Sequence, residues 1–124
     1  MARVEVKPHN FYRLLHPYRA TLITCTDGRG RVNVMAAAWV MPVSRNPPLL
    51  AVSIAPSRYT HELIKRTGEF VVNIPTADLV DQVYLCGSVS GREVDKVSRA
   101  GFKTEEAGEV KAPLLSNCVA HVEC

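Results

Sequence analysis

Four consecutive residues near the middle of the chain, Ser57-Arg58-Tyr59-Thr60, combine three hydroxyl-bearing side chains and a guanidinium where a helix is expected to begin. They follow the apolar residues 49–54, which are typical of a strand, and precede a helical pattern that ends at Gly68. The unpaired N–H groups of a helix N-terminus attract anions, and an arginine can hold a phosphate through two donors. The pattern therefore indicates an anion site. It is also consistent with a plain N-cap at Thr60 beside a solvated arginine.

A second polar cluster lies in the sequence GSVSGREVDK, residues 87–96. Two glycines there would allow the backbone to approach a ligand closely, while the neighbouring side chains supply donors. A solvent-washed loop that leads into a helix fits the same pattern. The polar residues singled out in this cluster are Ser88, Ser90, Arg92, Asp95 and Lys96.

The histidines and cysteines form no pattern for catalysis or metal binding. His61 and His121 accompany no serine or cysteine in a recognisable motif, so no catalytic residue is predicted. Metal sites favour close ligand pairs, and no two cysteines form a C-x-x-C pair. We therefore predict no metal site and interpret the cysteines as small buried residues in a reducing compartment. They are Cys25, Cys86, Cys118 and Cys124.

The elements that must position these clusters are mostly short strands. The sequence RATLITCTDGRGRVNVMAAAWV, residues 19–40, predicts a β-hairpin with its turn at residues 27–30. The apolar residues 34–43 predict a strand that is buried on both faces. Further strands are expected at 49–54, at 69–74 and at 117–124, where apolar and polar residues alternate.

Short helices are expected between the strands. One should start after Tyr59 with Thr60 as its N-cap, a second should start at Thr76 or Asp78, and a short third one should stop at Gly101. Many short strands with two or three small helices favour a β-barrel with helical insertions.

The size and composition are those of one globular domain. The chain has 124 residues, of which 47% are apolar and 22% are charged. The 15 basic and 12 acidic residues leave a net charge of +3 without a basic block, so no nucleic-acid partner is predicted. No segment approaches the roughly 18 apolar residues of a membrane span, and the N-terminus has no apolar signal core. We therefore expect a cytoplasmic protein without a membrane partner.

Four segments together resemble the flavin reductase-like proteins that bind FMN in a split β-barrel, a family that includes ferric reductases and flavoredoxins. In the order and spacing of the family, they are TLITCTDGRGRVNVMAAAW, PVSRNPPLLAVSIAPSRYTHELI, GEFVVNIP and CGSVSGREVDKVSRAGF. The resemblance implies a mainly β fold, an FMN-binding split β-barrel of Greek-key type with short helical insertions. Family members usually continue past the strand at 117–124, so we expect residues 1–124 to be one domain that lacks its C-terminal strands.

The resemblance also implies a cofactor site. The anion at residues 57–60 would be the 5′-phosphate of FMN, and alanines 36–38 would form a flat wall for the flavin ring. Asn33 would donate to the ring or the ribityl chain. The alanines would equally suit sheet or subunit packing, Asn33 a turn, and Trp39 the core or an interface. The implied FMN-binding residues are Asn33, Ala36, Ala37, Ala38, Trp39, Ser53, Ser57, Arg58, Tyr59, Thr60, Ser90, Arg92 and Lys96.

The implied activity is that of a homodimeric, FMN-dependent oxidoreductase of the flavin reductase or ferric reductase type. It would pass electrons from NADH or NADPH through bound FMN to free flavin, a ferric chelate or a protein partner. Two alternatives stay open, an FMN-bearing electron carrier without NAD(P)H activity and a flavin-free assembly domain. Anaerobic bleaching by a nicotinamide would distinguish the oxidoreductase from the electron carrier, and a colourless protein that ignores FMN would indicate the assembly domain.

Overall fold

The centre of the fold is a four-stranded antiparallel sheet in the order β2-β1-β5-β8. The computed structural model describes residues 2–124. The four strands of the sheet are β1 (Thr21–Thr26), β2 (Val32–Ala37), β5 (Val71–Ile74) and β8 (Ala120–Glu123). Two further antiparallel pairs are formed by β3 (Val40–Ser44) with β4 (Leu49–Val52), and by β6 (Thr104–Glu105) with β7 (Leu114–Leu115).

The predicted hairpin is confirmed. Strands β1 and β2 pair in register from Thr21 opposite Ala37 to Thr26 opposite Val32. The Asp27 carboxylate accepts hydrogen bonds from the backbone N–H groups of Arg29 at 2.7 Å and Arg31 at 3.1 Å, which closes the turn. All six residues of β1 are buried because β1 lies between β2 and β5.

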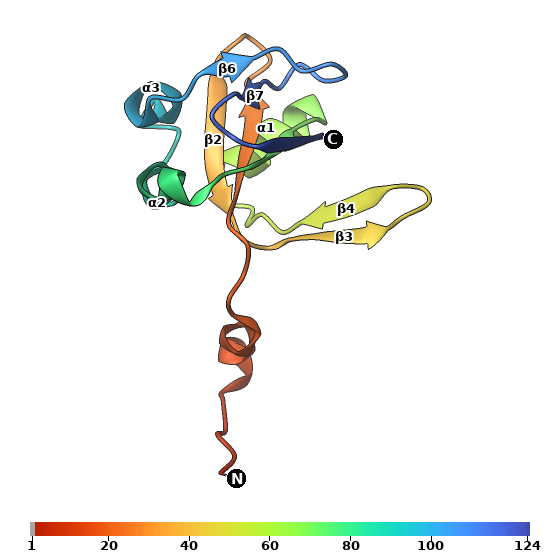
Figure 1. Ribbon diagram of the computed structural model, residues 1–124, viewed down its shortest axis with the longest axis vertical. Coiled ribbons are helices and arrows are strands. Elements are labelled where there is room, and N and C mark those ends of the chain that lie inside the picture. The colour runs from red at the N-terminus through yellow and green to blue at the C-terminus, as the bar shows by residue number, and fades with distance from the viewer. Residues whose placement is uncertain (1) are drawn as a thin grey trace.

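The prediction of one buried strand over residues 34–43 is wrong. Strand β2 ends at Ala37, where its partner β1 begins at Thr21, so no neighbour remains to continue the ladder. The chain passes through Ala38 and Trp39 and resumes as β3, which pairs with β4 and has no buried residue. The two strands form a hairpin that projects from the body of the protein (Figure 1). The strand predicted at 49–54 is confirmed over residues 49–52.

The N-cap of the first helix lies two residues earlier than predicted. Helix α1 spans Tyr59–Thr67, and its N-cap is Arg58 rather than Thr60, whose hydroxyl is engaged elsewhere. The helix ends as predicted, since Gly68 takes the left-handed conformation with φ of 77° and closes the last turn.

The other helices cover one face of the sheet. Residue Thr76 precedes a turn of 3-10 helix, η2 (Ala77–Leu79), which runs directly into α2 (Val80–Ser88). Residues 87 and 88 therefore belong to a helix rather than to the predicted polar loop, which is confined to 89–95. The short helix α3 (Lys96–Ala100) stops at Gly101 as predicted.

Two apolar clusters pack around the sheet. One joins Leu22 and Val34 of the hairpin to Leu79 and Cys86 of the helical side, and the other joins Ile23, Ala37 and Val72. The expectation for the cysteines is confirmed for Cys25, Cys86 and Cys118, which are buried, whereas Cys124 is partly exposed; all four are free thiols.

The N-terminal segment also projects from the body (Figure 1). It contains a 3-10 helix, η1 (Pro8–Leu15), none of whose residues is buried, and this element was not predicted. The pair β6–β7 was not predicted either. Among residues 2–124, no helix has the length and apolar character needed to cross a lipid bilayer.

Candidate functional site

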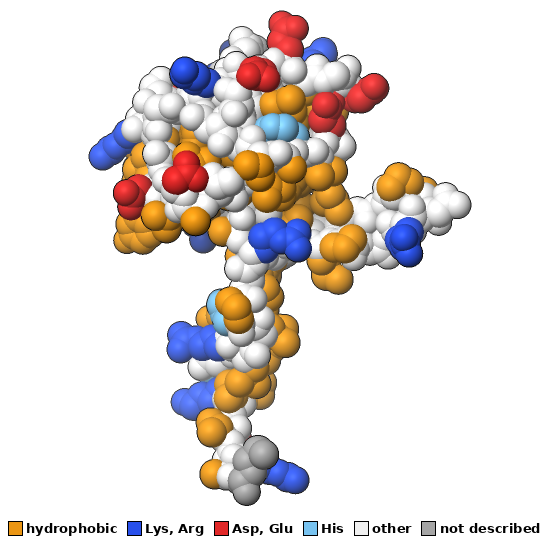
Figure 2. Space-filling model, in the orientation of Figure 1, with side chains coloured by type: hydrophobic (Ala, Val, Ile, Leu, Met, Phe, Trp, Pro, Cys, Tyr) orange, Lys and Arg blue, Asp and Glu red, His pale blue; other side chains and the backbone are white. Residues whose placement is uncertain are grey.

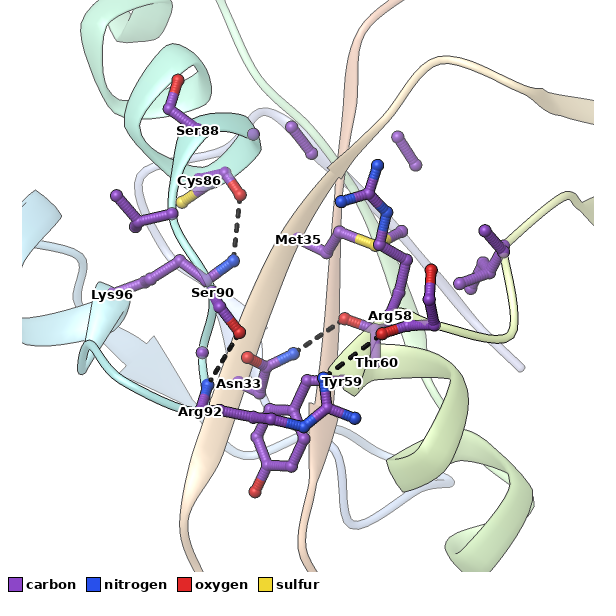
Figure 3. A pocket seen from close by; sticks show the side chains of 18 of the residues that line it. Asn33, Met35, Arg58, Tyr59, Thr60, Cys86, Ser88, Ser90, Arg92 and Lys96 are labelled. Carbon is purple, nitrogen blue, oxygen red and sulfur yellow. Dashed lines mark hydrogen bonds between the residues drawn. The ribbon is translucent and has the colours of Figure 1, made fainter.

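A cavity of about 790 Å³ opens beside β2 and brings together three segments that are distant in sequence (Figure 3). Its walls come from β2 and the residues after it, from the connection between β4 and α1, and from the end of α2 with the loop 89–95. All thirteen residues named from the sequence line this one cavity: Asn33, Ala36, Ala37, Ala38, Trp39, Ser53, Ser57, Arg58, Tyr59, Thr60, Ser90, Arg92 and Lys96.

The charged side chains of the cavity are all cationic. Arg58, Arg92 and Lys96 contribute to its lining, and no Asp or Glu does. The N-terminus of α1 adds unpaired backbone N–H groups, because no side chain caps it. This balance favours an anionic ligand.

Arg92 ties the loop 89–95 to the start of α1. Its guanidinium donates to the carbonyl oxygen of Ser57 at 3.2 Å and to Glu62 Oε2 at 3.0 Å. It also lies over the Tyr59 ring, 5.1 Å from the ring centroid, in cation–π geometry. The arginine side chain is half exposed and lines the cavity.

Arg31, which directly precedes β2, also holds the loop 89–95 near the start of α1. The sequence did not indicate a role for this residue. Its guanidinium donates to the carbonyl oxygen of Gly91 at 2.7 Å and lies 6.0 Å from the centroid of the Tyr59 ring. Two arginines therefore surround Tyr59 and hold the loop near the helix start.

Lys96 is a buried cation that forms no ion pair with a carboxylate of residues 2–124. Only 5% of its surface is exposed, and its ammonium donates to the carbonyl oxygen of Cys86 at 2.9 Å. Burial lowers the pKa of Lys96 below its usual range. Burial also raises the pKa of the Cys25 and Cys86 thiols to about 11, so both are neutral at neutral pH and neither balances the lysine. An ammonium in this setting favours a bound anion.

Asn33 occupies a different place from the one expected of a turn residue. It lies in β2, 5% exposed, and its side-chain amide donates to Thr60 Oγ1 at 2.9 Å (Figure 3). The same amide lies 3.7 Å from Cys25 Sγ. On the other side the backbone of Gly91 covers it, since a Cβ on that glycine would fall 1.9 Å from Asn33 Oδ1.

Ala36, Ala37 and Ala38 differ in their surroundings and in their exposure. Ala36 packs close to Gly87 of α2, where an added Cβ would lie 3.4 Å from the Ala36 methyl group. Ala37 is 8% exposed and belongs to the cluster with Ile23, whereas Ala38 is exposed. All three alanines line the cavity, where their small side chains add little bulk.

Trp39 stands at the edge of the cavity and not in the core. It is 47% exposed, and its ring meets the Tyr12 ring of the N-terminal segment edge-on with 5.8 Å between centroids. The segment that contains η1 thereby contacts the edge of the cavity.

Asp95 is a structural residue rather than part of the site. Its carboxylate accepts from the backbone N–H of Ser98 at 3.2 Å and from the Ser98 hydroxyl at 2.9 Å, so it caps α3. These hydrogen bonds lower the pKa of Asp95.

Several lining residues were not among the thirteen, mostly because they contribute backbone or small side chains. Gly87, Ser88 and Gly91 stand in the sequence next to or near selected residues, and this position could have identified them as lining residues. The additional lining residues are Met35, Ile54, Ala55, Pro56, Cys86, Gly87, Ser88, Val89 and Gly91.

The profile of the flavin reductase like domain matches residues 12–124. The chain belongs to this family. An uncharacterized protein of Archaeoglobus fulgidus is 43% identical to it over 115 residues, which cover 93% of this chain and 64% of that protein.

Solved structures of the family share the fold. The flavoredoxin of Methanosarcina acetivorans is 34% identical with a TM-score of 0.87, and the match covers 100% of this chain and 63% of that one. The FMN-binding protein of Thermus thermophilus is 31% identical with a TM-score of 0.80 over 99% of this chain and 66% of that one. The mainly β fold predicted from the resemblance to flavin reductase-like proteins is therefore confirmed.

This flavin reductase-like chain is shorter than its relatives. It spans about 64% of the length of the first two curated relatives that it matches. The expectation that further strands complete the domain stays a prediction.

Proposed function

We propose that the cavity binds FMN. The observation that carries this proposal is the composition of its lining, in which three cations and an uncapped helix N-terminus adjoin a wall of small apolar residues. A flavin mononucleotide has a matching shape, with a dianionic phosphate at one end and a flat ring at the other. Membership of the flavin reductase-like family supports the same ligand.

Different residues of the cavity would contact different parts of FMN. The hydroxyls of Ser57 and Thr60, the N-terminus of α1 and Arg58 would hold the phosphate, with Arg92 closing over it. The alanines 36–38 would give the ring a flat surface. Lys96 would stabilise negative charge inside the cavity, where its low exposure limits competition from water.

We further propose an oxidoreductase activity with a nicotinamide as the reductant. When bound, FMN would supply the redox chemistry that links NADH or NADPH to free flavin, a ferric chelate or a protein partner. The protein would orient the ring and supply donors toward the charge that develops on it. No side chain of the cavity is assigned an acid–base role, and the neutral thiol of Cys86 is not an activated nucleophile.

An FMN titration followed by anaerobic addition of NADH and then NADPH tests both proposals. Saturable binding of FMN with bleaching by either nicotinamide supports the oxidoreductase. A chain that takes up neither FMN nor riboflavin would overturn the cofactor assignment and favour a flavin-free assembly domain.

An electron carrier is the second candidate, because flavoredoxin of Methanosarcina acetivorans has so similar a structure. A carrier would bind FMN and be bleached by dithionite but keep its colour with both nicotinamides. The same titration therefore distinguishes the two candidates.

We also propose that the protein is a homodimer in the cytoplasm. Figure 2 shows hydrophobic side chains along both projecting elements, and those of η1 and the β3–β4 hairpin that are exposed are Phe11, Leu14, Leu15, Met41, Val43 and Leu49. In a closed, symmetric dimer, a second copy of the chain would cover these exposed hydrophobic side chains. Four free thiols suit a reducing compartment.

Sedimentation tests the dimer with matched variants. Leu14→Glu and Met41→Glu place a charge on the two projections and should shift the protein to monomer. Val80→Glu is the control, since Val80 is similarly exposed but lies on α2. Dissociation by all three variants, or by none, would contradict the proposed interface.

A further inference from the structure

Asn33 and Thr60 form a buried polar pair at the wall of the cavity. Asn33 is 5% exposed and Thr60 is 2% exposed, and the Asn33 amide nitrogen donates to Thr60 Oγ1 at 2.9 Å. Two apolar residues of similar shape would fill this space at little cost in stability. The pair therefore calls for a reason beyond packing.

The direction of the hydrogen bond supplies that reason. A hydroxyl has one proton to donate and two lone pairs to accept with. Because the Thr60 oxygen accepts from Asn33, its own proton must point elsewhere, and within residues 2–124 the hydroxyl donates no hydrogen bond to a protein atom. Thr60 lies on the second position of α1 and lines the cavity beside the helix N-terminus, so its proton is available to a ligand there.

The surroundings of Asn33 fix the orientation of its amide. Cys25 Sγ lies 3.7 Å from the amide nitrogen on the neighbouring strand, and Cys25 and Asn33 are register partners. The backbone of Gly91 closes the opposite side so tightly that no side chain fits there. The amide is thus packed between β1 and the loop 89–95, and its hydrogen bond to Thr60 connects it to α1.

We infer that Asn33 is a positioning residue that makes Thr60 a dedicated donor to the phosphate of FMN. This inference rests on the proposed function. It assigns Asn33 no contact with the flavin ring or the ribityl chain, in contrast to the expectation from the sequence. Asn33 acts through Thr60 and contributes to selectivity for a phosphorylated flavin over riboflavin, which lacks the phosphate.

A double-mutant cycle with both ligands tests the inference. Thr60→Val removes the hydroxyl at nearly constant shape and should weaken FMN binding by roughly 10- to 100-fold, because hydrogen bonds to a charged group are among the strong ones. Asn33→Leu leaves the hydroxyl free to rotate and should weaken FMN binding several-fold. Riboflavin affinity should change less than twofold in either variant, and Thr60→Ser should restore FMN binding.

The decisive comparison is the double variant. If Asn33 acts through Thr60, adding Asn33→Leu to Thr60→Val causes no further loss of FMN affinity. The inference would be overturned if Asn33→Leu lowers FMN affinity as much in the Thr60→Val background as in the wild type. It would also be overturned if the variants lose FMN and riboflavin affinity in parallel. Asn33→Ala serves as a second variant if the leucine prevents folding. Failure of the wild-type chain to bind FMN would instead overturn the proposed function, so the two failures are distinguishable.

Discussion

Gly91→Ala should both destabilise the protein and weaken its cofactor site. A methyl group at this position would lie 1.9 Å from Asn33 Oδ1, 3.0 Å from Asn33 Cγ and 3.2 Å from Tyr59 Cδ1. Favourable C···O contacts begin near about 3.3 Å, so the loop or Asn33 must move by more than about 1 Å. The Asn33 amide is held between two strands and α1, so a retreat of this size breaks its hydrogen bond to Thr60.

The expected cost is that of overpacking a closed site, about 1–3 kcal/mol. For a chain of this size that corresponds to a fall in melting temperature of roughly 4–12 °C. Movement of the loop also displaces Ser90 and Arg92 from the cavity, so FMN affinity should fall about tenfold or more. Thermal denaturation by circular dichroism without flavin, followed by an FMN titration at a temperature where the variant is folded, measures the two effects separately.

Gly87→Ala is the matched control because it should change stability in the opposite direction. Its added methyl group would sit 3.4 Å from that of Ala36, an ordinary contact, within α2. A compatible Gly→Ala change stabilises by about 0.4–1 kcal/mol. If Gly91→Ala melts with the wild type and binds FMN equally well, the close approach of the loop to Asn33 is not a constraint and the reasoning fails.

Three further perturbations test the cavity. Arg58→Ala should weaken FMN binding at least several-fold in fluorescence titrations and leave riboflavin nearly unaffected; an equal loss for both would remove Arg58 from the phosphate site. Ala38→Leu should block flavin uptake with little change in melting temperature, whereas Ala37→Leu should cost about 1–3 kcal/mol because Ala37 is in the core; normal uptake by Ala38→Leu would show that this alanine does not face the ring. Because the pKa of Lys96 is lowered, its ammonium loses its proton at a lower pH than ordinary lysines do, and FMN affinity should fall with it at alkaline pH. Lys96→Met should abolish that fall in affinity. A pH profile of FMN binding that the substitution leaves unchanged would contradict this role of Lys96.

The features that the sequence predicted best depend on local chemistry. The hairpin turn at residues 27–30 rests on an Asp carboxylate and two glycines with positive φ, and the ends of α1 and α3 rest on Gly68 and Gly101. The thirteen candidate residues come from three segments, and the antiparallel sheet with its crossing helix α2 places those segments around one cavity.

The features that the sequence did not predict depend on partners far along the chain. Residues 34–43 are continuously apolar, and only the end of β1 at Thr21 makes the strand change partner at Ala38. Thr60 looks like an N-cap, but its hydroxyl is occupied by Asn33, 27 positions away. Arg31 reaches Gly91 across 60 positions, a contact that no local pattern signals.

The route of the chain through Trp39 connects two parts of the protein that a ligand and a partner would use. One continuous segment supplies the alanine wall, then Trp39 with its contact to Tyr12, and then the projecting strand β3. If two copies associate through the projections, a flavin that favours the associated form must itself be held more tightly by that form, by the same factor. Cofactor retention would then depend on protein concentration, and dilution would release flavin from a chain whose every site residue is intact.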